Sequence, residues 1–456
     1  MENLQSINPV TGASIASYPV MSSETIKNRI EEAHRAHLDW KGLSFSERRH
    51  FLRRAADILE QKQNEYGRLI SLEMGKILPE AEAEVVKCAW VCRYYAEHAG
   101  SFLAAERINT DATLSYVTHK PLGVVLSVMP WNFPFWQVFR FAAPALMAGN
   151  AGLLKHASNV TGCARAIESI FEEAGCPKGL FAHLAIPGSR VDEVIAHPRV
   201  KAVTLTGSEI AGSAVAAQAG KHIKKTVLEL GGSDAYLILE DADLEQAAEA
   251  CTFARLLNAG QSCIGAKRFI PVAAIYDDFL ERFQAHMANA RMGDPFDKNA
   301  DLGPLARQDL RIQLHQQVQD SIQQGAKCVL GGEIPDLPGA YYPPTILTEV
   351  GPGMPAYREE LFGPVASVIR AEDEEDAIRI ANDSDFGLGS AVFTRDLARG
   401  EGIASERLEA GSCFVNTFVR SDPRLPFGGI KISGYGRELS RQGILEFVNV
   451  KTVYVE

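Results

Sequence analysis

The first hundred residues have the hydrophobic pattern of helices. Apolar side chains recur every three or four positions in residues 23–40, 44–75 and 79–100, and this spacing places them on one face of a helix. Glycines at the ends of the second and third stretches are typical of helix C-termini, because glycine adopts the left-handed conformation without strain. The pattern therefore predicts a helical N-terminal region.

From residue 122 onwards the pattern changes to short apolar runs that alternate with helical segments. The first series of runs covers residues 122–128, 151–157, 180–186, 200–206 and 224–230. A second series covers residues 234–240, 267–274, 327–332, 366–371, 389–394 and 411–417. Apolar strands that alternate with helices indicate parallel sheets covered on both faces. We predict an α/β fold with two lobes that meet near residue 230, and such sheets bind ligands at the carboxyl ends of their strands.

Two strand-like segments have no obvious place in either core. They are residues 103–121 and the tail 438–456. We predict that they form a hairpin arm and a tail that pair with another subunit, and the alternative is an edge hairpin within one chain. The first lobe then comprises residues 1–102 and 122–229, and the second lobe comprises residues 230–437.

Length and charge narrow the classes of function. A chain of 456 residues is too long for one ordinary core. The formal net charge of −11 argues against nucleic acid or an acidic membrane surface as a partner, because both attract basic proteins. No long uncharged apolar run survives, and the N-terminus lacks the basic start and apolar stretch of a signal peptide. We therefore expect no membrane span and no nucleic-acid binding.

The eight cysteines are scattered along the chain rather than clustered. This distribution favours reduced thiols and a cytoplasmic location. Cys88 and Cys92 lie four residues apart on one predicted helix face, but no second Cys or His pair follows at the spacing of a zinc site. We interpret the pair as core packing and expect no bound metal.

One cysteine has unusual neighbours. Residues 258–268 read NAGQSCIGAKR, so Cys263 is surrounded by small and polar residues. Most cysteines in soluble proteins act as small buried hydrophobic residues. Small neighbours would give a ligand clearance to approach the sulfur, but this stretch alone does not separate a packed cysteine from a reactive one.

Polar residues end several of the predicted strands in the first lobe. Lys155 is placed to bind a ribose or a phosphate, and Gly207 and Ser208 stand where a helix N-terminus would attract phosphate. Glu229 ends another strand beside two glycines, where a carboxylate could act as a general base on water. The alternatives are a solvated lysine, an ordinary strand–helix turn and a surface glutamate.

Two prolines fix the backbone of the loop that contains Trp131 and Asn132. An amide held in this way can donate a hydrogen bond to a developing oxyanion. The alternative is a proline-rich turn around a buried tryptophan.

Taken together, these stretches occur in a characteristic order. The motifs are NPVTG, PWNFP, LLKHAS, TLTGS, LELGGSD, GQSC, EELFGPV and PFGGIKISGYGRE. Over nearly its whole length the chain resembles the NAD(P)-dependent aldehyde dehydrogenase superfamily. The resemblance implies a Rossmann-type cofactor domain in the first lobe, an α/β catalytic domain in the second, and a β-hairpin oligomerisation arm. It also implies a homodimer or a dimer of dimers.

The resemblance implies a chemical role for three residues. Cys263 would attack an aldehyde as a thiolate, and Asn132 with the backbone N–H of Cys263 would hold the oxyanion. Hydride transfer would leave a thioester, and Glu229 would activate water to release the acid. The cofactor positions that carry over are Trp131, Asn132, Lys155, His156, Ala157, Ser158, Gly207, Ser208, Leu230, Glu360 and Phe362.

The substrate positions that carry over are Phe133, Arg140, Arg420 and Ser421. Burying an arginine in a closed pocket costs free energy unless an anion neutralises its charge. The guanidinium can bind a carboxylate through two hydrogen bonds. Arginine at position 140 resembles succinate-semialdehyde dehydrogenases, although some of them carry a second arginine where this chain has Leu257. We expect a small aldehyde with a distal carboxylate, and the alternative is that Arg140 forms a structural ion pair.

Two further expectations concern the cofactor, NAD or NADP, and the acceptor of the acyl group, water or CoA. Ser158 lacks the carboxylate with which many relatives repel the 2′-phosphate of NADP, but His156 is bulkier than the proline of NADP-using relatives. We expect NAD and NADP both to work, with a slight preference for NAD. A broad-range aldehyde dehydrogenase, a CoA-acylating semialdehyde dehydrogenase and a protein that lost its activity are the alternatives, and Glu229 favours water over CoA.

Overall fold

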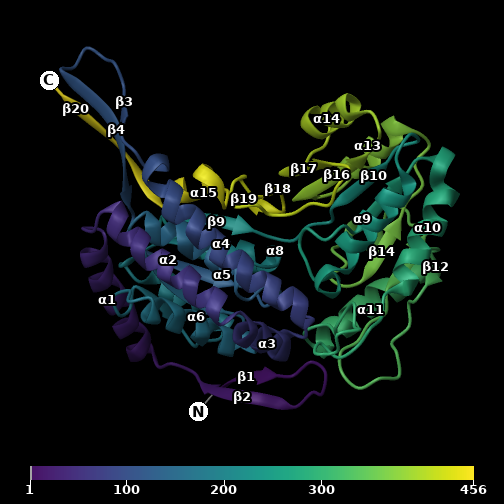
Figure 1. The fold of residues 1–456 in the computed structure, drawn as a ribbon, viewed down its shortest axis with the longest axis horizontal. Helices are drawn as coiled ribbons and strands as arrows, with labels where there is room; N and C mark the ends of the chain where they lie inside the picture. Colours follow the sequence, from purple (N-terminus) through teal and green to yellow (C-terminus); the bar gives the residue numbers. More distant parts are fainter. Residues whose placement is uncertain (1–2) are drawn as a thin grey trace.

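The computed structural model describes residues 3–456 and consists of two lobes with a projecting arm (Figure 1). The α/β architecture predicted from the hydrophobic pattern is confirmed. Each lobe has its own sheet and its own buried apolar core. The two lobes face each other across the carboxyl ends of several strands, which is where the candidate site lies.

The first lobe contains a six-stranded sheet in the order β19-β9-β8-β5-β6-β7. Its strands are β5 (Val124–Met129), β6 (Ala151–His156), β7 (Phe181–His183), β8 (Val200–Thr206), β9 (Lys225–Glu229) and β19 (Gly434–Tyr435). All neighbours are parallel except β19 with β9. The parallel strands are almost wholly buried, as expected for a sheet covered on both faces.

Helices surround this sheet. They are α1 (Ser23–Trp40), α2 (Phe45–Gln61), α3 (Gln63–Met74), α4 (Leu78–Phe102), α5 (Trp136–Met147), α6 (Thr161–Glu173), α7 (Val191–Ala196), α8 (Glu209–Lys221) and α15 (Ser440–Leu445), with short 3-10 turns η1 (Ser158–Val160) and η2 (Gly188–Arg190). A capping box between Ser44 and Glu47 starts α2, and left-handed Gly75 ends α3. Cys88 and Cys92 are fully buried in the core of this lobe.

The second lobe contains a seven-stranded sheet in the order β12-β13-β14-β11-β10-β16-β17. Its strands are β10 (Ala235–Ile238), β11 (Arg268–Pro271), β12 (Lys327–Leu330), β13 (Thr345–Thr348), β14 (Val365–Val368), β16 (Gly389–Phe393) and β17 (Ser412–Val415). The helical segments are α9 (Leu244–Leu256), η3 (Leu257–Gly260), η4 (Ala273–Ile275), α10 (Tyr276–Asn289), α11 (Gln308–Gln323), α12 (Pro355–Arg358), α13 (Glu374–Asn382) and α14 (Leu397–Glu406). Only the edge pair β12–β13 is antiparallel within this sheet.

Three further β elements lie outside the two large sheets. The arm at the upper left of Figure 1 is a three-stranded sheet of β3 (Glu106–Arg107), β4 (Leu114–Pro121) and β20 (Val448–Val455). The N-terminal strands β1 (Asn3–Ile7) and β2 (Ser14–Pro19) form a hairpin, and β15 (Phe386–Gly387) pairs with β18 (Ile430–Lys431). The two segments predicted to pair with another subunit pair with each other in one chain, along the whole of β20. The oligomeric state stays a prediction.

The structure differs from the sequence interpretation at four places, one of which is the short pair β15–β18, which was not predicted. The hairpin β1–β2 and strand β13 were not predicted, and β19 returns from the second half of the chain to pair with β9. The residues assigned to the second lobe thus include a segment, β19, that completes the first sheet. The sequence did not predict β19, because a two-residue strand is too short to leave a hydrophobic pattern. Within residues 3–456, no helix combines the length and apolarity needed to cross a bilayer.

Candidate active site

A cavity of about 610 Å³ lies between the lobes and receives residues from both. The first lobe contributes the loops that follow β5, β8 and β9, and the second contributes the turn at Cys263 and the loop before β14. The predicted site residues that line it are Trp131, Asn132, Gly207, Ser208, Leu230, Cys263, Glu360 and Phe362. Residues that are far apart in sequence therefore meet around one sulfur atom.

The backbone turn before Cys263 is left-handed at three consecutive residues. Asn258, Ala259 and Gly260 have φ values of 56°, 51° and 74°. This conformation costs a residue with a side chain about 1–2 kcal/mol, so it persists only where other contacts enforce it. One of these contacts comes from the first lobe, because Nδ2 of Asn258 donates a hydrogen bond to the carbonyl of Asn132 at 2.8 Å.

The second lobe fixes the same turn. A Cβ atom on Gly260 would lie 2.2 Å from the carbonyl oxygen of Gly363, so only glycine fits. The side chain of Gln261 accepts a hydrogen bond from the N–H of Ala306 at 2.9 Å. Gly260 therefore serves the packing of the loop, and clearance for a ligand at the other small neighbours of Cys263 stays a prediction.

A buried lysine holds the backbone of the cysteine itself. Nζ of Lys267 donates hydrogen bonds to the carbonyls of Ser262 and Cys263, both at 2.7 Å, and lies 3.3 Å from the carboxylate of Glu360. Sequence reasoning missed this role, although Lys267 stands in the quoted NAGQSCIGAKR stretch. Burial raises the pKa of Cys263 to about 12, although the positive charges of Arg140 and Lys267 lower it in part. The free protein therefore holds a thiol rather than a thiolate.

The side-chain amide of Asn132 is oriented by two partners. Its Oδ1 accepts a hydrogen bond from Nε2 of Gln137 at 3.1 Å, and its Nδ2 donates one to the carbonyl of Gln261 at 3.0 Å. The nitrogen thus points toward the turn that carries Cys263. Because Nδ2 has two hydrogens, one remains available for an oxygen bound at the sulfur.

Glu229 is a buried carboxyl group at the end of β9. Among the described residues, neither of its carboxylate oxygens has a hydrogen-bond partner. Burial raises its pKa well above the ordinary value, and the nearby charge of Glu438 raises it further, whereas Arg140 opposes this. A carboxylate whose pKa is raised is a stronger base than an ordinary carboxylate once it ionises.

Arg140 lies elsewhere than predicted. It is 2 % exposed, pairs with Glu438, and its Nη2 donates to Oγ1 of Thr206 at 3.3 Å. Its guanidinium also lies 4.8 Å from the centre of the Phe427 ring, and it is absent from the cavity lining. The structure favours the alternative that Arg140 forms a structural ion pair, because Glu438, from a distant part of the chain, already neutralises the charge of Arg140.

The other predicted substrate residues have different surroundings. Phe133 is half-buried, and Arg420 is exposed with its guanidinium 5.3 Å from the ring centre of Phe418. Ser421 is buried, and its Oγ accepts a hydrogen bond from Nζ of Lys87 at 2.9 Å. Lys87 was not among the predicted site residues.

Residues predicted to contact the cofactor form two groups. Trp131 and Phe362 meet edge to face in the cavity, with ring centres 5.7 Å apart. Lys155, Ala157 and Ser158 line a second cavity of about 760 Å³, next to the first-lobe sheet. Lys155 is 8 % exposed, and no carboxylate of residues 3–456 lies within ion-pair distance of it. Burial lowers its pKa.

The side chain of His156 contacts the protein backbone rather than the cavity. Its ring nitrogens lie 3.2 Å from the carbonyl of Met129 and 2.8 Å from that of Pro134. Burial lowers its pKa to about 4, so the imidazole is neutral. The ring of His156 stabilises the loop that carries Asn132. The second cavity is lined by its neighbours Lys155, Ala157 and Ser158 and not by His156.

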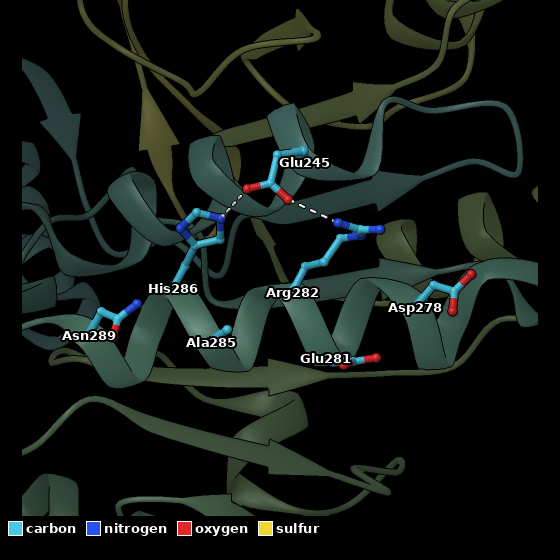
Figure 2. A pocket seen from close by; sticks show the side chains of 7 residues that line it. All are labelled: Glu245, Asp278, Glu281, Arg282, Ala285, His286 and Asn289. Carbon is cyan, nitrogen blue, oxygen red and sulfur yellow. Dashed lines mark hydrogen bonds and ion pairs between the residues drawn. The ribbon is translucent and has the colours of Figure 1, made fainter.

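A further pocket, of about 370 Å³, lies on helices α9 and α10 and is drawn in Figure 2. Glu245 accepts a hydrogen bond from His286 at 2.9 Å and pairs with Arg282 at 3.1 Å. Glu245 and Arg282 are exposed and His286 is half-buried, and the three side chains pair with one another. None of the predicted site residues lines the pocket.

The chain resembles known proteins over its whole length. A model of the aldehyde dehydrogenase family matches residues 1–453. A protein of Synechocystis sp. named probable succinate-semialdehyde dehydrogenase, NADP(+), is 51 % identical over 452 residues, which is 99 % of each chain. Succinate-semialdehyde dehydrogenase 1, NADP(+), of Mycobacterium tuberculosis is 47 % identical over 455 residues, again 99 % of each chain. The crystal structure of succinic semialdehyde dehydrogenase from Streptococcus pyogenes with NADP+ superposes with a TM-score of 0.97, at 39 % identity and 99 % coverage of both chains.

The turn at Gly260 gives a first prediction. Gly260→Ala combines a left-handed alanine with a clash against the Gly363 carbonyl, and we expect it to lower the free energy of unfolding by more than about 2 kcal/mol. Denaturant melts and steady-state turnover measure the effect. Gly402→Ala is the matched control, because a Cβ there meets nothing within 4 Å. Equal stability of the two variants would contradict the assignment of the turn.

The ion pair of Arg140 gives a second prediction. Arg140→Leu leaves Glu438 buried without its cation beside Glu229, and removal of one partner of a buried pair costs about 3–5 kcal/mol. We expect a lower melting temperature and an equal loss of turnover with acidic and neutral aldehydes.

Arg53→Leu serves as the control for Arg140→Leu, because it breaks an exposed pair with Glu97 and should be nearly neutral. A rise in KM that is confined to acidic aldehydes would instead place Arg140 on the substrate.

Proposed function

Because this chain belongs to the aldehyde dehydrogenase family, we propose that it oxidises succinate semialdehyde, or a similar short carboxy-aldehyde, to the dicarboxylic acid with NADP as the hydride acceptor. The observation that carries the proposal is the cavity in which Cys263 meets Asn132, Glu360 and Phe362. Relatives at 47–51 % identity named for succinate semialdehyde support the substrate.

The first step is addition of the Cys263 sulfur to the aldehyde carbon. The thiol has a raised pKa in the free protein, so its proton must pass to solvent water as the carbon–sulfur bond forms. Arg140 and Lys267 both favour the thiolate, because a nearby positive charge stabilises it. The product of this step is a thiohemiacetal whose oxygen carries the developing negative charge.

That oxygen needs hydrogen-bond donors. The free N–H of Nδ2 in Asn132 points toward the cysteine turn, and the backbone N–H of Cys263 is a second candidate donor. Gln137 keeps the Asn132 amide from rotating. Donors that are oriented before the charge develops stabilise it without reorganisation.

Glu229 would then act on the thioester. Its unpartnered carboxylate oxygens can accept a proton from water, which attacks the acyl carbon and releases the carboxylic acid from Cys263. The high pKa that burial and Glu438 impose makes Glu229 a stronger base when it ionises. A general base on water argues against a CoA acceptor.

The residues present fit a nicotinamide dinucleotide. Glu360 and the aromatic pair of Trp131 and Phe362 lie in the cavity with Cys263, and Lys155 and Ser158 line a second cavity. When bound, this cofactor accepts the hydride from the thiohemiacetal carbon. Lys155 has no carboxylate partner among residues 3–456, and Ser158 carries no negative charge, so the part of the cavity that they line suits a phosphate.

The slight preference for NAD expected from the bulk of His156 receives no support. Its ring is buried against backbone carbonyls, and the relatives named above carry NADP(+) in their names. We therefore propose NADP as the preferred cofactor.

We also propose a cytoplasmic homo-oligomer that associates through the arm. Its eight cysteines are all free, and the arm presents exposed apolar side chains such as Val450 and Tyr454. Light scattering of the purified protein tests the oligomeric state.

A panel of aldehydes tests the proposed substrate. We expect kcat/KM for succinate semialdehyde to exceed that for butanal, which has the same chain length without the carboxylate, by at least tenfold. Equal values would favour a broad-range aldehyde dehydrogenase, and a requirement for CoA would favour the acylating alternative.

Glu229→Gln separates the two halves of the reaction. We expect the variant to release one equivalent of NADPH per site rapidly and then to stall, because the amide cannot accept a proton from water. Stopped-flow absorbance measures the burst. In the wild type, hydrolysis should accelerate as pH rises through the raised pKa of Glu229, since only the ionised form is a base. Cys263→Ser is the control and should show no burst.

Ser158→Glu tests whether the part of the second cavity lined by Lys155 and Ser158 binds the 2′-phosphate of NADP. A carboxylate there would pair with the lysine and repel the 2′-phosphate of NADP. We expect KM for NADP to rise at least tenfold while KM for NAD changes by less than threefold. An equal effect on both cofactors would place the 2′-phosphate elsewhere.

A further inference from the structure

Helix α4 carries two carboxyl groups that the proposed mechanism does not use. Glu80 and Glu84 lie four residues apart, so their side chains extend from the same face of the helix. Glu84 is 5 % exposed and pairs with Lys76, which is 3 % exposed. A buried ion pair often stabilises a fold no more than apolar residues of the same size would. The backbone groups that these carboxylates bind give them a different role.

Glu84 fixes the loop that carries Asn132. Its Oε1 accepts hydrogen bonds from the backbone N–H groups of Phe135 and Trp136, at 2.8 and 3.0 Å. These groups stand at the start of α5, which has no side-chain cap of its own. Because the first N–H groups of a helix need acceptors and favour a negative charge, Glu84 ties the end of this loop to α4.

Lys76 holds the same loop at a second point. Its Nζ lies 3.7 Å from the ring centre of Phe133, the residue next to Asn132. The ammonium thus neutralises Glu84 and packs against an aromatic ring of the loop at the same time.

Glu80 fixes the turn that carries Cys263. Its Oε2 accepts a hydrogen bond from the backbone N–H of Asn258 at 3.0 Å. Asn258 is the first of the three left-handed residues, and its Nδ2 donates to the carbonyl of Asn132. The carbonyl of Gln261 accepts from the side chains of both Asn258 and Asn132. The hydrogen bond from Asn258 to Glu80 therefore acts where the loop and the turn meet.

We propose that Glu80 is a positioning residue, which together with Glu84 sets the side-chain amide of Asn132 against the backbone N–H of Cys263. These two groups are the candidate donors to the oxyanion and come from different lobes, and one turn of α4 holds the backbone beside each. The inference rests on the proposed function and adds to it the residues that keep the donors aligned. Alignment matters because a displacement of about 1 Å at a reacting centre can slow a reaction roughly 100-fold.

Two conservative variants of Glu80 separate its position from its charge. Glu80→Asp keeps the carboxylate but is one carbon shorter, so it withdraws the acceptor from the N–H of Asn258. Glu80→Gln keeps the length and the acceptor oxygen and removes the charge. Burial raises the pKa of Glu80 to about 7, although Lys76 lowers it in part, so a neutral side chain should be tolerated at this position.

Single-turnover kinetics measure the effect. With enzyme in excess over aldehyde, stopped-flow absorbance follows the formation of NADPH, which does not require hydrolysis of the thioester. We expect this rate to fall roughly 10- to 100-fold in Glu80→Asp, equally with succinate semialdehyde and butanal, and to stay within about threefold of the wild type in Glu80→Gln. The Kd for NADP, measured by fluorescence titration, should change by less than about twofold, because Glu80 lines neither cavity.

Asn132→Ala provides a second readout. Loss of one oxyanion donor costs about 100- to 1,000-fold in rate. If Glu80 acts by aligning that donor, Glu80→Asp should lose most of its effect in the Asn132→Ala background, because residues that act together are not additive. A role in stability alone would give the same factor in both backgrounds.

Glu82→Asp is the matched control. Glu82 lies on the same helix and accepts a hydrogen bond from the exposed side chain of Asn64 at 2.7 Å, so shortening it should leave the rate unchanged. The proposal is overturned by a wild-type rate in Glu80→Asp, by an equally slow Glu80→Gln, by an equal loss in both backgrounds, or by a loss that only follows a lower melting temperature. If the wild type forms no NADPH with either aldehyde, the proposed function fails instead.

Discussion

The left-handed turn at residues 258–260 determines where the reactive sulfur lies, and both lobes hold it. The amide of Asn258 donates to the loop after β5 in the first lobe, whereas Gly260 rests on the carbonyl of Gly363 in the second. Neither lobe alone supplies both contacts. The position of Cys263 is therefore a property of the interface between the lobes, and a shift of one lobe against the other would move the sulfur relative to Asn132.

The charges around this turn set a second constraint. Two buried carboxyl groups, Glu229 and Glu438, share the single guanidinium of Arg140. Because like charges in a poorly solvated region do not both ionise readily, the pair retains a proton and titrates as a unit. The resting site is accordingly close to neutral, with a thiol at Cys263 and a protonated acid nearby. Under the proposed function, proton movement accompanies each chemical step rather than preceding it.

The sequence was sufficient for the architecture and for the residues at the cavity, but not for the ion pairs. Most strands of the two large sheets were located from their pattern, including the four-residue strands β10, β11 and β14. The two residues of β19 carry too little pattern to be recognised, and only two of the four residues of β13, TILT, are apolar. Arg140 could be identified as a conspicuous arginine, but its partner Glu438 lies at the other end of the chain. Glu80 and Lys267 were missed for the same reason, since their importance depends on what surrounds them in space.

The return of the C-terminal segment to the first lobe has a consequence for biosynthesis. Strand β19 completes the sheet beside β9, and β20 pairs with β4 along its whole length. Chains emerge from the ribosome N-terminus first, and domains generally fold as they appear. Here the lobe that is translated first keeps two strand edges open until β19 and β20 are made, and open edges invite pairing with other chains. The nascent protein is therefore exposed to aggregation until β19 and β20 emerge, when the seven-stranded sheet of the second lobe already has all its strands.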